Sequence, residues 1–194
     1  MTMNWANPIT LGRLILTGLF LICISLNQPA AYRIALILFL LASLTDAADG
    51  IIARKSSRIS LFGICADTVA DKILIATALI CFVQIPDLKI PAWPVVLIIA
   101  REFLILGLRI LGATSGNIPA AEVWGKWKML TQTLAVLAIL LYLAAPAKIP
   151  LAPPLPMALI FLAAAATWIS GILYLQHHWN LLKGSWIQPP ASLG

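Results

Sequence analysis

Six long segments of the chain are apolar on nearly every face, and short polar breaks separate them. The segments extend over about Leu11–Leu26, Arg33–Ala53, Leu61–Ile85, Trp93–Leu111, Val123–Ala145 and Pro156–Leu181. Helices of about 20 apolar residues are long enough to cross the ~30 Å hydrocarbon layer of a bilayer. The pattern therefore predicts an all-α membrane protein, a bundle of six transmembrane helices. We expect one domain over residues 1–194, with a loosely ordered tail at about 184–194.

Composition supports a membrane protein over a soluble one. The chain is 61% hydrophobic and 10% charged, whereas a soluble domain has about 25% charged residues. The net charge of +6 does not indicate nucleic-acid binding, because no soluble fold is predicted to carry a basic stripe. No Lys or Arg precedes Arg13, so the basic region of a signal peptide is missing. We interpret the first segment as an uncleaved membrane helix.

The basic residues predict an orientation in the membrane. The breaks after the first, third and fifth segments carry one basic residue each, namely Arg33, Lys89 and Lys148. The breaks after the second, fourth and sixth segments carry more, namely Arg54, Lys55, Arg58, Arg109, Lys126, Lys128 and Lys183. Lys and Arg concentrate on the cytoplasmic side of membrane proteins. Both termini and the breaks rich in basic residues are therefore expected in the cytoplasm.

Four carboxylates stand out within this apolar chain. On the second segment, acidic and small residues recur at i, i+3, i+4 and i+7: Asp46, Asp49, Gly50 and Ala53. On the third, they recur at i, i+4 and i+8: Gly63, Asp67 and Asp71. Each set shares one helix face. Because the two helices are joined by a short loop, we expect all four carboxylates to converge near the cytoplasmic boundary.

An ionised Asp is costly in a bilayer, so a cluster of four indicates a functional site. The cluster offers only oxygen ligands, which favour a hard divalent cation such as Mg²⁺ or Mn²⁺. Two cations a few Å apart would suit phosphoryl displacement. A cation or proton transporter is the alternative from another class of protein. It explains less well the small residues and the nearby basic residues Arg54 and Arg58.

The eight residues form the pattern Asp-x2-Asp-Gly-x2-Ala-Arg-x8-Gly-x3-Asp-x3-Asp. At every one of these positions the chain resembles the CDP-alcohol phosphotransferases, whose membrane core is a six-helix bundle. The resemblance implies two metal ions held by Asp46, Asp49, Asp67 and Asp71. It implies that Asp71 is the general base acting on the acceptor hydroxyl. It also implies that Gly50 and Arg54 contact the CDP-linked donor.

Further residues are candidates for donor binding. Ala53 and Gly63 remove side-chain bulk, which lets a ligand lie against backbone. Ser60 lies at the same rim. The stretch Asn7-x2-Thr10-x2-Arg13 is similar to the opening of many family members, and Thr10 at a helix start would meet the donor diphosphate. The alternative for Asn7 and Thr10 is a plain helix N-cap. Lys72 either balances the charge of the site or reaches the membrane interface.

Two later stretches concern the acceptor. Residues 100–109 and 124–132 look like bacterial phosphatidylglycerophosphate synthases, a branch that uses CDP-diacylglycerol and glycerol 3-phosphate. Arg101, Arg109 and Lys126 would form a basic pocket for the acceptor phosphate, and Glu102 shares a helix face with Arg109. The alternatives are structural polar contacts for Arg101 and Glu102, and orientation charges for Lys126 and Lys128. Thr68 stands where this branch usually has Pro, which slightly weakens the assignment.

The resemblance implies an enzyme of the bacterial plasma membrane, with a cytoplasmic site and a homodimeric assembly. A cardiolipin synthase that uses phosphatidylglycerol as acceptor is the runner-up, and inositol-phosphate or serine acceptors rank lower. We interpret His177 and His178 as interfacial polar residues rather than metal ligands. The three cysteines, Cys23, Cys65 and Cys81, are interpreted as packing residues.

Overall fold

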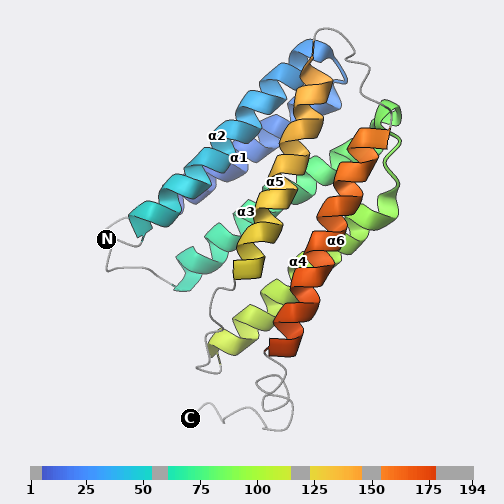
Figure 1. Cartoon of the computed structure of the whole chain (residues 1–194). Helices are drawn as coiled ribbons and strands as arrows, with labels where there is room; N and C mark the ends of the chain where they lie inside the picture. Colours follow the sequence, from blue (N-terminus) through green and yellow to red (C-terminus); the bar gives the residue numbers. More distant parts are fainter. Residues whose placement is uncertain (1–5, 54–60, 115–122, 146–153, 178–194) are drawn as a thin grey trace.

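The computed structural model describes residues 6–53, 61–114, 123–145 and 154–177, which form a bundle of long helices (Figure 1). A 3₁₀ turn, η1 (Pro86–Leu88), precedes the fourth helix. The helices are α1 (Ala6–Ser25), α2 (Pro29–Ala53), α3 (Leu61–Gln84), α4 (Ala92–Thr114), α5 (Val123–Ala144) and α6 (Pro154–His177). The described residues contain no strand. The prediction of an all-α chain with six helical segments is therefore confirmed.

Several helices begin earlier or end later than the apolar pattern predicts. The helix α2 begins at Pro29 and α6 at Pro154, because proline suits the first turn, where its missing N–H is not needed. The helix α1 begins at Ala6, so Thr10 lies inside the helix with its side chain buried. The interpretation of Thr10 as an N-cap is therefore wrong.

Successive helices run in alternating directions, and contacts between distant segments hold them together (Figure 1). The helix α1 packs against both α2 and α3, and among the described residues it contacts each of them more extensively than α2 and α3 contact each other. The helix α5 packs against α2 and α6, and α4 packs against α6 and α3. The last turns of α2, α4 and α6 therefore lie toward the same end of the bundle as the first turns of α1, α3 and α5.

The apolar core consists of aliphatic and aromatic side chains where the helices meet. The rings of Phe20 and Phe39 lie 6.0 Å apart between centroids at a tilt of 50°, within the range of favourable aromatic pairs. Other fully buried members include Phe82, Leu74, Leu79, Ile98, Ile139, Leu140 and Ile160. Close packing of these side chains holds the helices together through van der Waals contacts.

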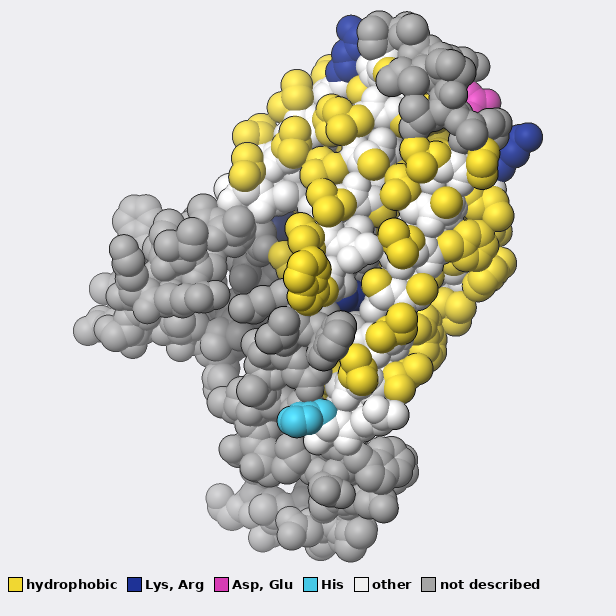
Figure 2. Space-filling view, in the orientation of Figure 1, with side chains coloured by type: hydrophobic (Ala, Val, Ile, Leu, Met, Phe, Trp, Pro, Cys, Tyr) yellow, Lys and Arg dark blue, Asp and Glu magenta, His cyan; other side chains and the backbone are white. Residues whose placement is uncertain are grey.

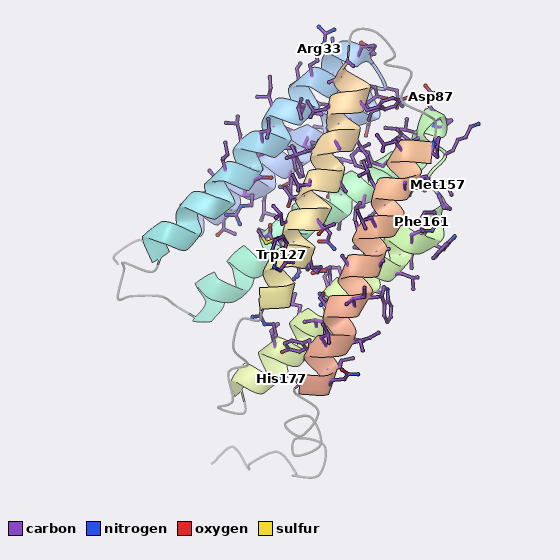
Figure 3. The ribbon with its side chains drawn as sticks, in the orientation of Figure 1. Arg33, Asp87, Trp127, Met157, Phe161 and His177 are labelled. Carbon is purple, nitrogen blue, oxygen red and sulfur yellow. The ribbon has the colours of Figure 1, made fainter. Side chains whose placement is uncertain are left out.

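The outer surface is strongly apolar (Figure 2). Large hydrophobic side chains are exposed on every helix. Arg33 and Asp87 lie at one end of the bundle (Figure 3), where Arg33 Nε donates to the Ala144 carbonyl at the end of α5 (3.3 Å). Among the described residues, two stretches are long and apolar enough to cross a membrane, Trp127–Ala144 of α5 and Pro154–His177 of α6. Shorter apolar stretches cover Thr10–Ser25 and Pro29–Thr45.

Candidate active site

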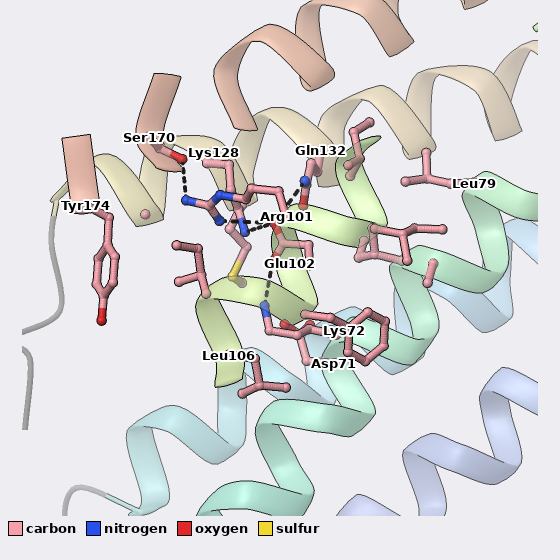
Figure 4. A pocket seen from close by; sticks show the side chains of 18 of the residues that line it. Asp71, Lys72, Leu79, Arg101, Glu102, Leu106, Lys128, Gln132, Ser170 and Tyr174 are labelled. Carbon is pink, nitrogen blue, oxygen red and sulfur yellow. Dashed lines mark hydrogen bonds and ion pairs between the residues drawn. The ribbon is translucent and has the colours of Figure 1, made fainter. Parts of the chain in front are cut away.

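A cavity of about 270 Å³ lies among α3, α4, α5 and α6 (Figure 4). One part of its wall is aliphatic and includes Ile75, Leu79, Ile98 and Leu106. The remainder is unusually polar for the interior of a helical bundle. The polar lining consists of Asp71, Lys72, Arg101, Glu102, Arg109, Lys128, Gln132, Ser170 and Tyr174. The cavity is close to the lower end of the volume range of ligand pockets, about 300 Å³, and therefore suits a small polar ligand.

The carboxylate of Glu102 is the centre of a buried hydrogen-bond network. Its Oε2 accepts from Lys72 Nζ on α3 at 2.5 Å. Its Oε1 accepts from Lys128 Nζ on α5 at 2.5 Å and from Arg101 Nη1 at 3.3 Å. Gln132 Nε2 also donates to Oε1, at 3.4 Å. Charge-assisted hydrogen bonds of this kind are stronger than neutral ones, so Glu102 links three helices firmly.

Two bonds extend this network to α6. Arg101 Nη2 donates to Ser170 Oγ at 2.8 Å, and Gln132 Nε2 donates to Thr167 Oγ1 at 2.8 Å. Thr167 Oγ1 in turn donates to the Ala163 carbonyl at 2.6 Å. Arg101 Nε has no hydrogen-bond partner among the described residues. Polar groups of four helices are thus coupled across the bundle.

The polar lining carries an excess of positive charge. Four cationic side chains, Lys72, Arg101, Arg109 and Lys128, face two carboxylates, Asp71 and Glu102. Lys128 and Arg101 are each 8% exposed. Among the described lining residues, cationic side chains outnumber carboxylates by two, and Arg109 is the exposed one of the four. This described part of the lining therefore favours an anionic ligand, because hydrogen bonds between ionised partners are strong. A phosphate dianion matches that excess.

Three residues that the sequence predicts for the site line this cavity together. Asp71, the expected base, shares it with Arg101 and Arg109, the expected ligands of the acceptor phosphate. Thr10, an expected donor contact, is buried in α1 and does not line the cavity. Arg54 and Ser60 lie outside the described residues. The side chains of the other predicted site residues also lie outside the described part, namely Asn7, Asp46, Asp49, Gly50, Ala53, Gly63, Asp67 and Lys126.

The predicted metal site is therefore described only at Asp71. Within the described residues, no group of three His, Cys, Asp or Glu side chains comes together. The side chains of three of the four expected ligands, Asp46, Asp49 and Asp67, lie outside the described part. The donor set is four carboxylates in the sequence, and that chemistry fits a hard divalent cation. The two-cation site remains a prediction. His177 is exposed at the end of α6.

The structure adds residues that the sequence did not assign to the site. Lys128, interpreted above as an orientation charge, is buried and bonded to Glu102. Lys72 also points inward to Glu102 rather than outward to an interface. The sequence of α6 does indicate a polar face: Thr167, Ser170 and Tyr174 recur at i, i+3 and i+7 in an otherwise apolar helix. That spacing places them on one face.

Gly171 allows Arg101 to pack against α6, and replacing it tests that packing. A Cβ at Gly171 would lie 2.8 Å from Arg101 Nε and 3.3 Å from Cγ. Such overpacking costs about 1–3 kcal/mol, more than the helix-propensity gain of at most about 1 kcal/mol. Gly171→Ala should therefore lower the thermal unfolding midpoint in detergent. Gly18→Ala is the matched control, because nothing lies within 4 Å of its Cβ position. An equal rise in both midpoints would contradict the packing.

Comparison with known proteins identifies similar chains. A sequence model described as CDP-alcohol phosphatidyltransferase matches residues 3–175. The chain is 39% identical to the CDP-diacylglycerol–glycerol-3-phosphate 3-phosphatidyltransferase of Bacillus subtilis, over 94% of this chain and 98% of the relative. It is 36% identical to a probable phosphatidylglycerophosphate synthase of Mycobacterium tuberculosis, over 89% and 80%. A Haemophilus influenzae relative with the same name as the Bacillus protein is 33% identical, over 91% and 92%.

Proposed function

The chain belongs to the CDP-alcohol phosphatidyltransferase family, and we propose that it transfers the phosphatidyl group of CDP-diacylglycerol to glycerol 3-phosphate. The products are phosphatidylglycerophosphate and CMP. One observation carries the choice of acceptor: Asp71 lines the same cavity as Arg101, Arg109 and Lys128. Glycerol 3-phosphate needs both features, a base for its hydroxyl and cations for its phosphate. The names of the relatives agree with this acceptor.

The proposal includes six membrane-spanning helices in a bacterial plasma membrane. The exposed apolar side chains on all six helices and the charged groups inside the bundle support this arrangement. The cavity lies toward the end of the bundle where α4 ends and α5 begins. The excess of basic residues in the sequence at that end supports a cytoplasmic location for the cavity and for both termini. The soluble acceptor then enters from water. A homodimer, which the family resemblance implies, remains a prediction.

The donor binds between the second and third helices with its acyl chains in lipid. Donor contacts come from Asn7, Thr10, Gly50, Ala53, Arg54, Ser60 and Gly63. Two divalent cations, Mg²⁺ or Mn²⁺, would be held by Asp46, Asp49, Asp67 and Asp71. When bound, such cations neutralise charge that develops on the diphosphate oxygens. Arg54 at the rim provides a planar fork that matches phosphate oxygens.

In the proposed reaction, the acceptor phosphate is held by Arg101 and Arg109, which line the cavity, together with Lys126. Asp71 accepts the proton of the free primary hydroxyl of the acceptor. The hydroxyl oxygen forms a bond to the phosphorus that carries diacylglycerol. The bond from that phosphorus to the oxygen shared with CMP breaks, and CMP leaves with the electron pair. The buried network around Glu102 keeps the lysine and arginine side chains of the cavity in place during this step.

An acceptor panel tests the proposal. The purified protein is incubated with CDP-diacylglycerol, Mg²⁺ and one acceptor at a time, and CMP is measured. We expect CMP release that depends on glycerol 3-phosphate. Release with phosphatidylglycerol instead would indicate a cardiolipin synthase, and release with inositol phosphate or serine would indicate those acceptors. No CMP with any acceptor, together with cation flux in liposomes, would indicate a transporter.

Replacing Arg109 with alanine should weaken acceptor binding selectively. Arg109 lines the cavity, and a charge-assisted bond to phosphate contributes about 1.5–3 kcal/mol. We expect Arg109→Ala to raise the KM for glycerol 3-phosphate about tenfold or more, with little change in the KM for CDP-diacylglycerol. Arg33→Gln at the other end of the bundle is the control. Equal effects on both substrates would contradict the pocket.

A further inference from the structure

The Glu102 network joins one carboxylate to several cations of the described part of the chain. Three cations, Lys72, Lys128 and Arg101, contact the single carboxylate of Glu102. These three cations all line the cavity, and the expected base Asp71 lines it with them. The network therefore lies at the site where the acceptor is expected to bind.

The two oxygens of Glu102 are divided between different parts of the bundle. Oε2 accepts from Lys72, the residue next to Asp71 on α3. Oε1 accepts from Lys128 and Arg101, on α5 and α4. One carboxylate thus joins α3, which carries the expected base, to α4 and α5 (Figure 4). These two helices carry the cationic wall of the cavity, which consists of Arg101, Arg109 and Lys128. The Glu102 side chain is 9% exposed, so water competes little for these bonds.

We propose that Glu102 is a positioning residue for the acceptor. By holding Lys72, Lys128 and Arg101, its carboxylate places the cationic wall at a set distance from Asp71. A phosphorylated alcohol bound by that wall then has its hydroxyl within reach of the base. Glu102 does not itself contact the reacting atoms. The inference rests on the proposed function, since it assigns the acceptor's phosphate to this wall.

The test compares charge removal with charge retention at this position. Glu102→Gln keeps the shape of the side chain but removes its charge. The amide NH₂ group would then face the ammonium group of a lysine, and two hydrogen-bond donors would oppose each other. Glu102→Asp keeps the negative charge on a side chain that is shorter by one methylene group. We expect Glu102→Gln to raise the KM for glycerol 3-phosphate about tenfold or more and to lower kcat, while the KM for CDP-diacylglycerol changes less than about twofold. Glu102→Asp should recover part of the loss. Asp87→Asn, exposed at the far end of the bundle, is the charge-matched control.

A merely structural role gives a different result. Loss of folded protein lowers the maximal rate and leaves both KM values unchanged, and that pattern would overturn the proposal. If Glu102→Gln does not fold, the double variant Lys72→Met/Glu102→Gln removes one charge of each sign. We expect it to fold and to retain the raised KM for glycerol 3-phosphate; a wild-type KM in that variant would also overturn the proposal.

A binding measurement separates this proposal from the proposed function. Glycerol 3-phosphate or inorganic phosphate should raise the unfolding midpoint of the wild-type protein, and the rise should be lost in Glu102→Gln. If the wild type releases no CMP with glycerol 3-phosphate, the proposed function fails, while the midpoint shift still tests Glu102. If the wild type turns over and Glu102→Gln retains both the shift and the KM, the positioning role fails alone.

Discussion

Asp71→Asn should abolish CMP release from CDP-diacylglycerol in the presence of glycerol 3-phosphate and Mg²⁺. An amide cannot accept the hydroxyl proton, and loss of a general base costs about 10²–10⁴-fold in rate. Asp71 is also an expected metal ligand, so the combined loss should lie at the upper end of that range. The side chain lines the cavity beside Lys72 (Figure 4). The measurement is the initial rate of CMP release by purified protein.

The variant must be folded for this result to bear on Asp71. An unchanged elution volume and unfolding midpoint in detergent would establish that. Asp87→Asn removes the same charge at an exposed position and should retain the wild-type rate. Near wild-type, metal-dependent CMP release by folded Asp71→Asn would show that the assignment of the base is wrong.

Removing divalent cations should have a comparably large effect. Four carboxylates at helical spacing, Asp46, Asp49, Asp67 and Asp71, offer oxygen ligands only. Cations at such a site stabilise transition-state charge by several kcal/mol, which corresponds to about 10³-fold in rate. We expect excess chelator to stop CMP release, and Mg²⁺ or Mn²⁺ to restore it. Sodium chloride at the same ionic strength should not restore CMP release, because screening of charge does not replace a divalent cation bound by the carboxylates.

Full CMP release in excess chelator would contradict the metal site. Recovery with only one of the two metals would instead settle which cation the site prefers. The unfolding midpoint is a second measurement: divalent cations should raise it in the wild type and raise it less in Asp67→Asn.

The helices could be predicted from the sequence because each segment carries its own signal. Runs of apolar residues separated by Pro and Gly identified all six, and the errors lie at the ends. Pro29 and Pro154 were read as parts of breaks, although both begin helices. The mistake has a physical cause: proline interrupts a helix interior but suits its first turn.

The shared cavity of Asp71, Arg101 and Arg109 could be predicted only in part. Charged residues inside apolar helices were recognisable as functional candidates. The partners of Glu102 were not, because Lys72, Lys128 and Gln132 come from helices distant in the chain, and no local spacing reports such pairings. The polar face of α6, with Thr167 and Ser170, did have a local signal. Its role became visible only once α6 was placed against α4 and α5.

The central claim is that the hydroxyl oxygen of glycerol 3-phosphate becomes bonded to the phosphorus of the phosphatidyl group. Acceptor labelled with ¹⁸O at its free primary hydroxyl tests this directly, with mass spectrometry of the lipid and of CMP. We expect labelled phosphatidylglycerophosphate and unlabelled CMP in equal amounts. Phosphatidic acid without label, or a lipid product that forms only with another acceptor, would contradict it.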